Sequence, residues 1–162
     1  MKIGKATIIK LFLFIISFQL TIVSAQKNFS KSQIRKLKTE TLDLVQSKHK
    51  MTQVMIDKVF SFAELGHQEY ETSKYLTGIL ESEGFEIEYG ISGIPTAWIA
   101  RWNYGEGPVI ALGSDVDGIP KASQYPAVAY HKPMVDGAPG HGEGHNSGLP
   151  IVITSALVIQ QQ

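Results

Sequence analysis

The chain contains no cysteine, and this absence excludes disulfide bonds as well as a lipid-anchored cysteine. Net charge is also absent, because 15 basic and 15 acidic residues balance each other in a chain of 162 residues. No basic run extends beyond residues 35–38, and that run falls on a predicted helix, where it is typical of a solvated face. We therefore expect no nucleic-acid partner.

The sequence also lacks an apolar run long enough to cross a bilayer comfortably. Its most apolar stretch near the start, residues 11–23, spans 13 positions and contains Gln19 and Thr21. Lysines precede this run, and small residues follow it at 23–25, which is typical of a secretory signal peptide. We expect residues 1–25 to be such a peptide and the protein to be exported to a periplasm or the cell exterior. An uncleaved membrane anchor is the alternative.

Length and a hydrophobic fraction of 43% are those of one ordinary globular domain. Apolar residues recur at helical spacing in the first half of the chain, and alternating or continuous apolar runs typical of strands follow. The pattern predicts an α/β fold, with helices at 30–50, 51–63, 71–83 and 151–159, half-buried strands at 85–89 and 97–102, and a buried central strand at 108–113.

A glycine-rich segment at 136–148 contains three potential metal ligands at a spacing of two, namely His141, Glu143 and His145. In an extended backbone, side chains at this spacing point to one face, so both imidazoles and the carboxylate would converge. Two neutral histidines and a carboxylate suit zinc and similar divalent ions. The alternative is a polar glycine loop whose histidines face water.

Two carboxylates, Asp115 and Asp117, directly follow the predicted central strand 108–113. Open α/β sheets place ligands just beyond the ends of such strands. A carboxylate there can accept a hydrogen bond from a metal-bound histidine and fix the orientation of its ring. The alternative is a pair of turn aspartates before Gly118.

Taken together, three segments resemble the amidohydrolase branch of the aminoacylase/carboxypeptidase metallopeptidases, in particular the p-aminobenzoyl-glutamate hydrolase type. They are residues 62–72, 114–120 and 136–146, and they occur in the family's order. The resemblance covers about residues 51–162. It implies a zinc-exopeptidase-like α/β domain with helices on a mixed sheet, of which residues 26–162 would be the N-terminal portion, ending before the lid and dimerisation domain.

The resemblance further implies two divalent ions, zinc or manganese, that activate a water to cleave the amide bond of an N-acyl amino acid or peptide-like conjugate. In this branch the ligands at the matching positions are a bridging cysteine and a histidine, which are Glu143 and His145 here. A carboxylate can also bridge two metals, and it favours harder ions such as manganese more than a thiolate does.

By the same resemblance, Asp115 corresponds to the strand-end aspartate that supports the metal site, whereas His141 is not usually a ligand. The family's general-base glutamate, its other metal ligands and its dimerisation domain lie downstream of the matching segments. We therefore do not assign the general base to Glu143. We expect the complete protein to be a homodimer and these 162 residues alone to be inactive, with weak metal binding.

Two alternatives remain open from the sequence. The chain can be a degenerate homologue or binding protein that retains part of the fold without catalysis, and the missing cysteine favours this somewhat. A self-contained zinc site made by His141, Glu143 and His145 is the other alternative. That site would be lost on His141→Ala, whereas the family resemblance predicts little effect from this change and a clear one from His145→Ala.

Overall fold

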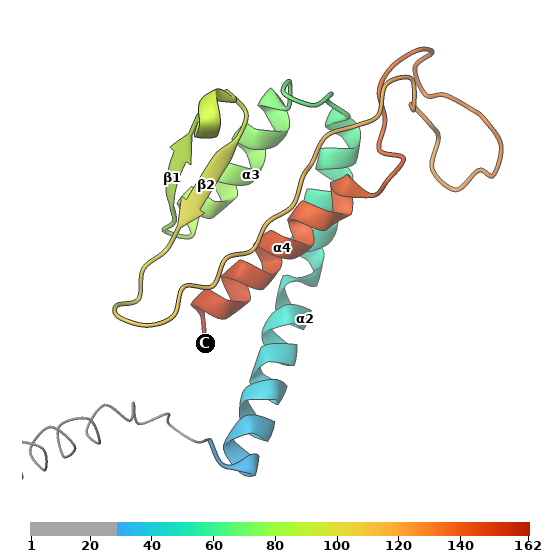
Figure 1. The fold of residues 1–162 in the computed structure, drawn as a ribbon. Helices are drawn as coiled ribbons and strands as arrows, with labels where there is room; N and C mark the ends of the chain where they lie inside the picture. The colour runs from blue at the N-terminus through green and yellow to red at the C-terminus, as the bar shows by residue number, and fades with distance from the viewer. Residues whose placement is uncertain (1–28) are drawn as a thin grey trace, which may run out of the picture. The chain divides into compact units, whose positions relative to one another are not determined.

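The computed structural model describes residues 29–162, so the expected signal peptide lies outside the described residues. The chain divides into two compact units, residues 1–36 and 37–162. The elements in chain order are α2 (Lys31–Phe62), α3 (Tyr70–Ser82), β1 (Glu86–Tyr89), the short 3-10 helix η2 (Ile91–Gly93), β2 (Trp98–Arg101) and α4 (His145–Gln160) (Figure 1). Within residues 29–162, no helix combines the length and the apolar character needed to span a membrane.

Helix α2 is one continuous helix of 32 residues, so the prediction of two helices meeting near residue 50 was wrong. No glycine or proline interrupts it, and the basic residues at 48–50 suit a helix interior as well as a helix end. The helix ends where Ala63 turns to a positive φ of 46° while its N–H still donates to the Val59 carbonyl at 3.3 Å. The residue that stops α2 is thus an alanine in the left-handed conformation, which sequence rules assign to glycine.

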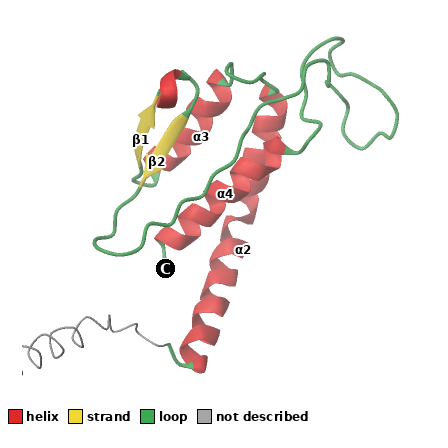
Figure 2. Ribbon diagram, in the orientation of Figure 1, coloured by secondary structure: helices red, strands yellow, loops and turns green. Residues whose placement is uncertain are grey.

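Helix α3 and the β1–β2 hairpin match their predicted positions. The two strands pair antiparallel, with Tyr89 opposite Trp98. The hairpin is fastened to α3 by hydroxyl groups, because Ser73 Oγ donates to the Thr96 carbonyl at 2.9 Å and Tyr89 Oη donates to Thr77 Oγ1 at 2.7 Å. Figure 2 shows the two yellow strands beside this red helix.

The core of the second unit lies where three helices meet. Its buried side chains come from α2, α3 and α4, and they are Met55, Val59, Leu76, Leu80, Leu149, Ile153 and Leu157. Burial of one such side chain stabilises the fold by about 1.5–3 kcal/mol. A hydroxyl pair at 2.7 Å, Thr52 with Thr154, joins α2 to α4 beside this core. The first turn of α4, which carries part of the glycine-rich motif, is therefore held by a packed helix.

The predicted central strand at 108–113 was wrong. Within the described residues, no backbone hydrogen bond involves this segment, and Val109 is 94% exposed. A strand needs a partner to satisfy its N–H and C=O groups, and an apolar run does not reveal whether one is present. The α/β class is confirmed, but the described sheet has two antiparallel strands, and parallel pairing is confined to one isolated bridge between Leu65 and Gly118.

Candidate metal centre

The three sequence motifs are joined by short backbone pairings. The Gly118 N–H donates to the Glu64 carbonyl at 2.6 Å, next to the parallel bridge between Leu65 and Gly118. Ile119 and Gly140 then form an antiparallel bridge with N···O distances of 2.8 and 3.0 Å. These pairings bring the aspartate segment 115–117 and the glycine segment 140–145 to the same place in the fold.

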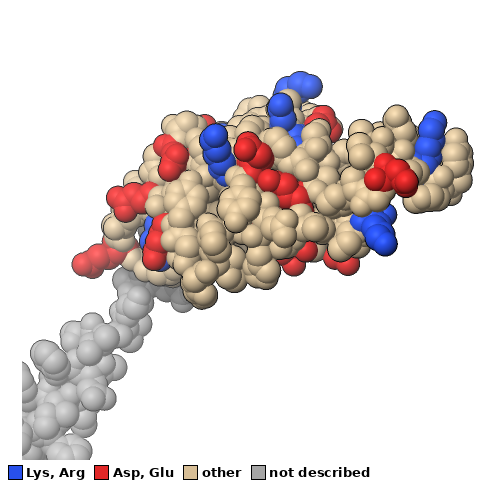
Figure 3. All heavy atoms as spheres, turned by 90° about the horizontal axis from the view of Figure 1, so that it is seen from above, with Lys and Arg blue, Asp and Glu red and all other residues tan. Residues whose placement is uncertain are grey.

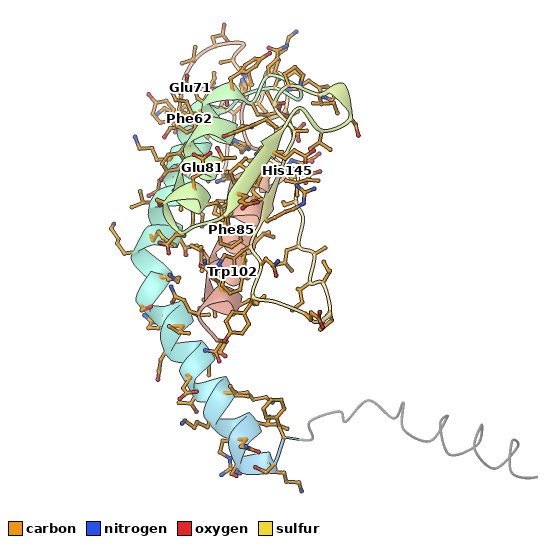
Figure 4. The ribbon with its side chains drawn as sticks, turned by 90° about the vertical axis from the view of Figure 1, so that its left-hand side faces the viewer. Phe62, Glu71, Glu81, Phe85, Trp102 and His145 are labelled. Carbon is orange, nitrogen blue, oxygen red and sulfur yellow. The ribbon has the colours of Figure 1, made fainter. Side chains whose placement is uncertain are left out.

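The first motif has a structural task that the sequence analysis did not identify. Both carboxylate oxygens of Glu64 accept backbone N–H groups at the start of α3, from Glu71 and Thr72, each at 2.9 Å. They satisfy donors that a helix leaves unpaired at its N-terminus, where a negative charge is also favoured. Figure 4 labels Glu71 at this end of α3. The signal was a glutamate seven residues ahead of a helix, which local capping rules do not cover.

His145 is the first residue of α4, and Gly144 delivers it there. Gly144 has a φ of 94°, a left-handed conformation that a side chain would strain, and its carbonyl accepts the Ser147 N–H at 2.9 Å. Figure 4 labels His145 at the end of α4 where the chain enters the helix. The N-terminal end of a helix carries partial positive charge, so carboxylates are favoured near His145.

Both ring nitrogens of His145 face oxygen atoms. Nδ1 lies 3.0 Å from Asp117 Oδ1 and 3.2 Å from the Asp117 carbonyl. Both are acceptors, so Nδ1 carries the hydrogen and donates it. Nε2 lies 3.4 Å from Asp115 Oδ1 and 3.3 Å from Glu143 Oε2. A neutral His145 thus directs an Nε2 lone pair at two carboxylates.

This arrangement requires a positive charge between Nε2 and the two carboxylates. A proton supplies it when no ion is present, since imidazolium is a donor at both nitrogens. Burial of the His145 ring lowers its pKa, but the charge of Asp115 and the hydrogen bond to Asp117 more than offset this, so the pKa is raised. The His145 side chain is only 24% exposed, whereas those of Asp115 and Glu143 are 72% and 62% exposed. The open side of the site is therefore lined by oxygen ligands.

The same charge can come from a divalent ion. One ligand atom from each of Asp115, Asp117 and His145 lies within 4.8 Å of the others, and Glu143 reaches the same Nε2. One imidazole nitrogen with carboxylate oxygens is a donor set suited to zinc and manganese. The hydrogen bond from Nδ1 to Asp117 is the kind of contact that orients a metal-binding histidine. Seen from above in Figure 3, red acidic side chains gather near the middle of the face.

The sequence-predicted residues are thus brought together in part. Glu143, His145 and Asp115 meet at one nitrogen, and Asp117, not Asp115, accepts the hydrogen bond from Nδ1. His141 does not join them, because its Nε2 lies 3.0 Å from the Val59 carbonyl at the end of α2. The spacing rule requires an extended backbone, and the left-handed Gly144 breaks that geometry.

The environment of His141 differs from that of His145. The ring is partly buried, and its Nδ1 is buried without a hydrogen-bond partner among the described residues. Burial lowers the pKa of His141, and this outweighs the opposite effect of its hydrogen bond to Val59. His141 is therefore neutral at pH 7, and its Nε2 carries the hydrogen because the Val59 carbonyl can only accept.

Comparison with known proteins gives four significant relatives. The chain is 31% identical over 105 residues to p-aminobenzoyl-glutamate hydrolase of Escherichia coli, which covers 65% of this chain and 22% of the relative. It is 29% identical over 103 residues to thermostable carboxypeptidase 1 of Saccharolobus solfataricus, covering 63% of this chain and 25% of that protein. It is 30% identical over 104 residues to IAA-amino acid hydrolase ILR1-like 2 of Arabidopsis thaliana, covering 64% and 23%.

The matched region spans less than a third of the length of each of these relatives. No protein-family model matches the chain.

Proposed function

This chain is related to the amidohydrolases and carboxypeptidases, as its motifs indicated, and we propose that it contributes the metal-binding part of a hydrolase active site. The substrate class that we propose is the amide bond of an N-acyl amino acid or of a peptide-like conjugate. The names of the relatives support this class, since they describe cleavage of conjugates of glutamate or other amino acids and of peptides.

One observation carries the metal dependence. His145 Nε2 is faced by Asp115 and Glu143 at 3.4 and 3.3 Å, and two carboxylates beside an imidazole lone pair are stable only with a cation or a proton between them. The open side of the site leaves that position accessible, because both carboxylates are more than half exposed.

In the proposed site, Glu143 and His145 hold the ion, and Asp115 stands close enough to serve as a further ligand. A divalent ion at this position polarises an amide carbonyl and lowers the pKa of water. Asp117 keeps the hydrogen on Nδ1 of His145 and so keeps Nε2 free as a ligand atom. We expect the general base to come from another part of the protein, because the three carboxylates of the site are engaged with His145.

Metal binding is the first test. We expect the metal-free protein to bind manganese or zinc in isothermal titration calorimetry, and His145→Ala and Glu143→Gln each to weaken the affinity at least tenfold. His49→Ala and Glu106→Gln are matched controls, since both residues are exposed and outside the site. Unchanged affinity in both site variants would refute the assignment.

Hydrolysis is the second test. The metal-loaded protein is incubated with p-aminobenzoyl-glutamate and a panel of N-acyl amino acids, and release of free amine is followed. Amine release that depends on the added metal is the expected result. Metal binding without release from any member of the panel would favour the non-catalytic alternative, in which the chain retains the site as a binding domain.

Export and dimerisation complete the proposal. The composition of residues 1–25 supports export, and the family resemblance supports a homodimer. N-terminal sequencing of the protein recovered from culture medium or periplasm tests the first, and light scattering at several concentrations tests the second.

A further inference from the structure

His141 is the one member of the glycine-rich motif whose ring turns away from the candidate metal centre. Its Nε2 lies 3.0 Å from the Val59 carbonyl, and its ring lies 6.4 Å from that of Phe60. Val59 is fully buried, and its carbonyl also accepts the Ala63 N–H. The imidazole therefore inserts the glycine-rich segment into the C-terminal end of α2.

This contact fixes the backbone immediately before the metal-binding residues. Gly140 is held on one side, because a Cβ there would lie 2.1 Å from the Ala122 carbonyl oxygen and because Gly140 pairs with Ile119. His141 supplies the next fixed point. Glu143 follows two residues later with a carboxylate that is 62% exposed, so its position depends on this anchored backbone.

We propose that His141 is a positioning residue for the candidate metal centre and not a metal ligand, acting by donating its Nε2–H to the Val59 carbonyl. The proposal rests on the proposed function, because positioning has meaning only if Glu143 and His145 hold an ion. It predicts that the donor atom at the position of Nε2 is what matters, and that the buried, unpartnered Nδ1 does not contribute.

Two substitutions separate a positioning role from ligation. Glutamine carries an amide N–H at nearly the same distance from the backbone as Nε2 of histidine, whereas asparagine is shorter by one methylene group. We expect His141→Asn to weaken manganese binding about tenfold and His141→Gln to remain within about threefold of the unchanged protein, by calorimetry. His131→Asn, at an exposed loop position, is the matched control.

The outcomes discriminate clearly. Loss of metal affinity in both variants would overturn the proposal, because it would make His141 a ligand. Unchanged affinity in His141→Asn, with only its unfolding temperature lowered, would overturn it in the other direction and leave a purely structural contact.

A separate readout protects the inference from failure of the proposed function. In ¹⁵N NMR of the metal-free protein, His141 should show the Nε2–H tautomer with an Nε2–H that exchanges slowly. The Nδ1–H tautomer would overturn the proposal whether or not the protein binds metal. Absence of metal binding by the unchanged protein, with the expected tautomer present, would instead refute the proposed function.

Discussion

Asp117→Asn is the substitution that best tests how His145 is held. Asp117 accepts the His145 Nδ1–H through Oδ1 at 3.0 Å, and its own backbone carbonyl lies 3.2 Å from the same nitrogen. Asparagine keeps the size and the acceptor oxygen of the side chain but loses its charge. The substitution therefore isolates the charge in this hydrogen bond.

The magnitude follows from the difference between two kinds of hydrogen bond. A bond to a charged group contributes about 1.5–3 kcal/mol, and a neutral one contributes about 0.5–1.5 kcal/mol. Asp117 is 40% exposed, so solvent screening places the loss at the lower end, at about 1 kcal/mol. That corresponds to a metal affinity weakened about fivefold. The backbone carbonyl still accepts from Nδ1, which limits the effect.

Manganese titrations of the unchanged protein, of Asp117→Asn and of Asp136→Asn measure this difference. Asp136 is an exposed aspartate in the neighbouring loop and should leave the affinity unaltered. Identical affinity in Asp117→Asn would mean that the charge of Asp117 does not support His145. A loss beyond about a hundredfold would exceed what an orienting contact supplies and would make Asp117 a direct ligand.

Two further predictions concern the backbone and pH. Gly140→Ala places a Cβ 2.1 Å from the Ala122 carbonyl oxygen and so breaks both hydrogen bonds to Ile119, which lowers the free energy of unfolding by about 1–3 kcal/mol in urea denaturation; Gly107→Ala has no atom within 4 Å of its Cβ and should be neutral, and equal stability of the two variants would contradict this account. Because the pKa of His145 is raised in the folded state, the stabilisation it gives to the metal-free protein is complete below about pH 6.5 and is lost as the pH rises through the folded pKa. Urea denaturation at several pH values should therefore show a decline above neutrality that is shallower in His145→Gln, and equal slopes would refute the ion-pair geometry.

Local patterns sufficed for part of the fold. Helix α3 and the β1–β2 hairpin follow from apolar spacing within single short segments, because each element buries one face against its neighbour. The segment 108–113 failed for the opposite reason: its apolar residues match a central strand, but strand formation depends on partners elsewhere in the chain. The continuity of α2 past residue 50 also escaped prediction, because basic residues are favourable at a helix end without forcing one.

The candidate site shows a similar division. Residue types at spacing two identified Glu143 and His145, and alternation placed Asp115 and Asp117 on one face. Neither pattern decides which aspartate meets which ring nitrogen, since that depends on how α4 directs His145 toward the 115–117 segment. The outward turn of His141 depends on contact with α2, which lies some eighty residues earlier and leaves no trace in the local sequence.

The unpaired segment 108–113 has a consequence for the behaviour of the protein in solution. An exposed, extended, apolar stretch with free backbone donors and acceptors is a template for strand addition and therefore for aggregation. Proline at its start and charges at its end oppose such addition, and here these are Pro108 and the exposed carboxylate of Asp115. The acidic residue at the metal centre thereby also acts as a gatekeeper, so neutralising it reduces colloidal solubility along with metal affinity.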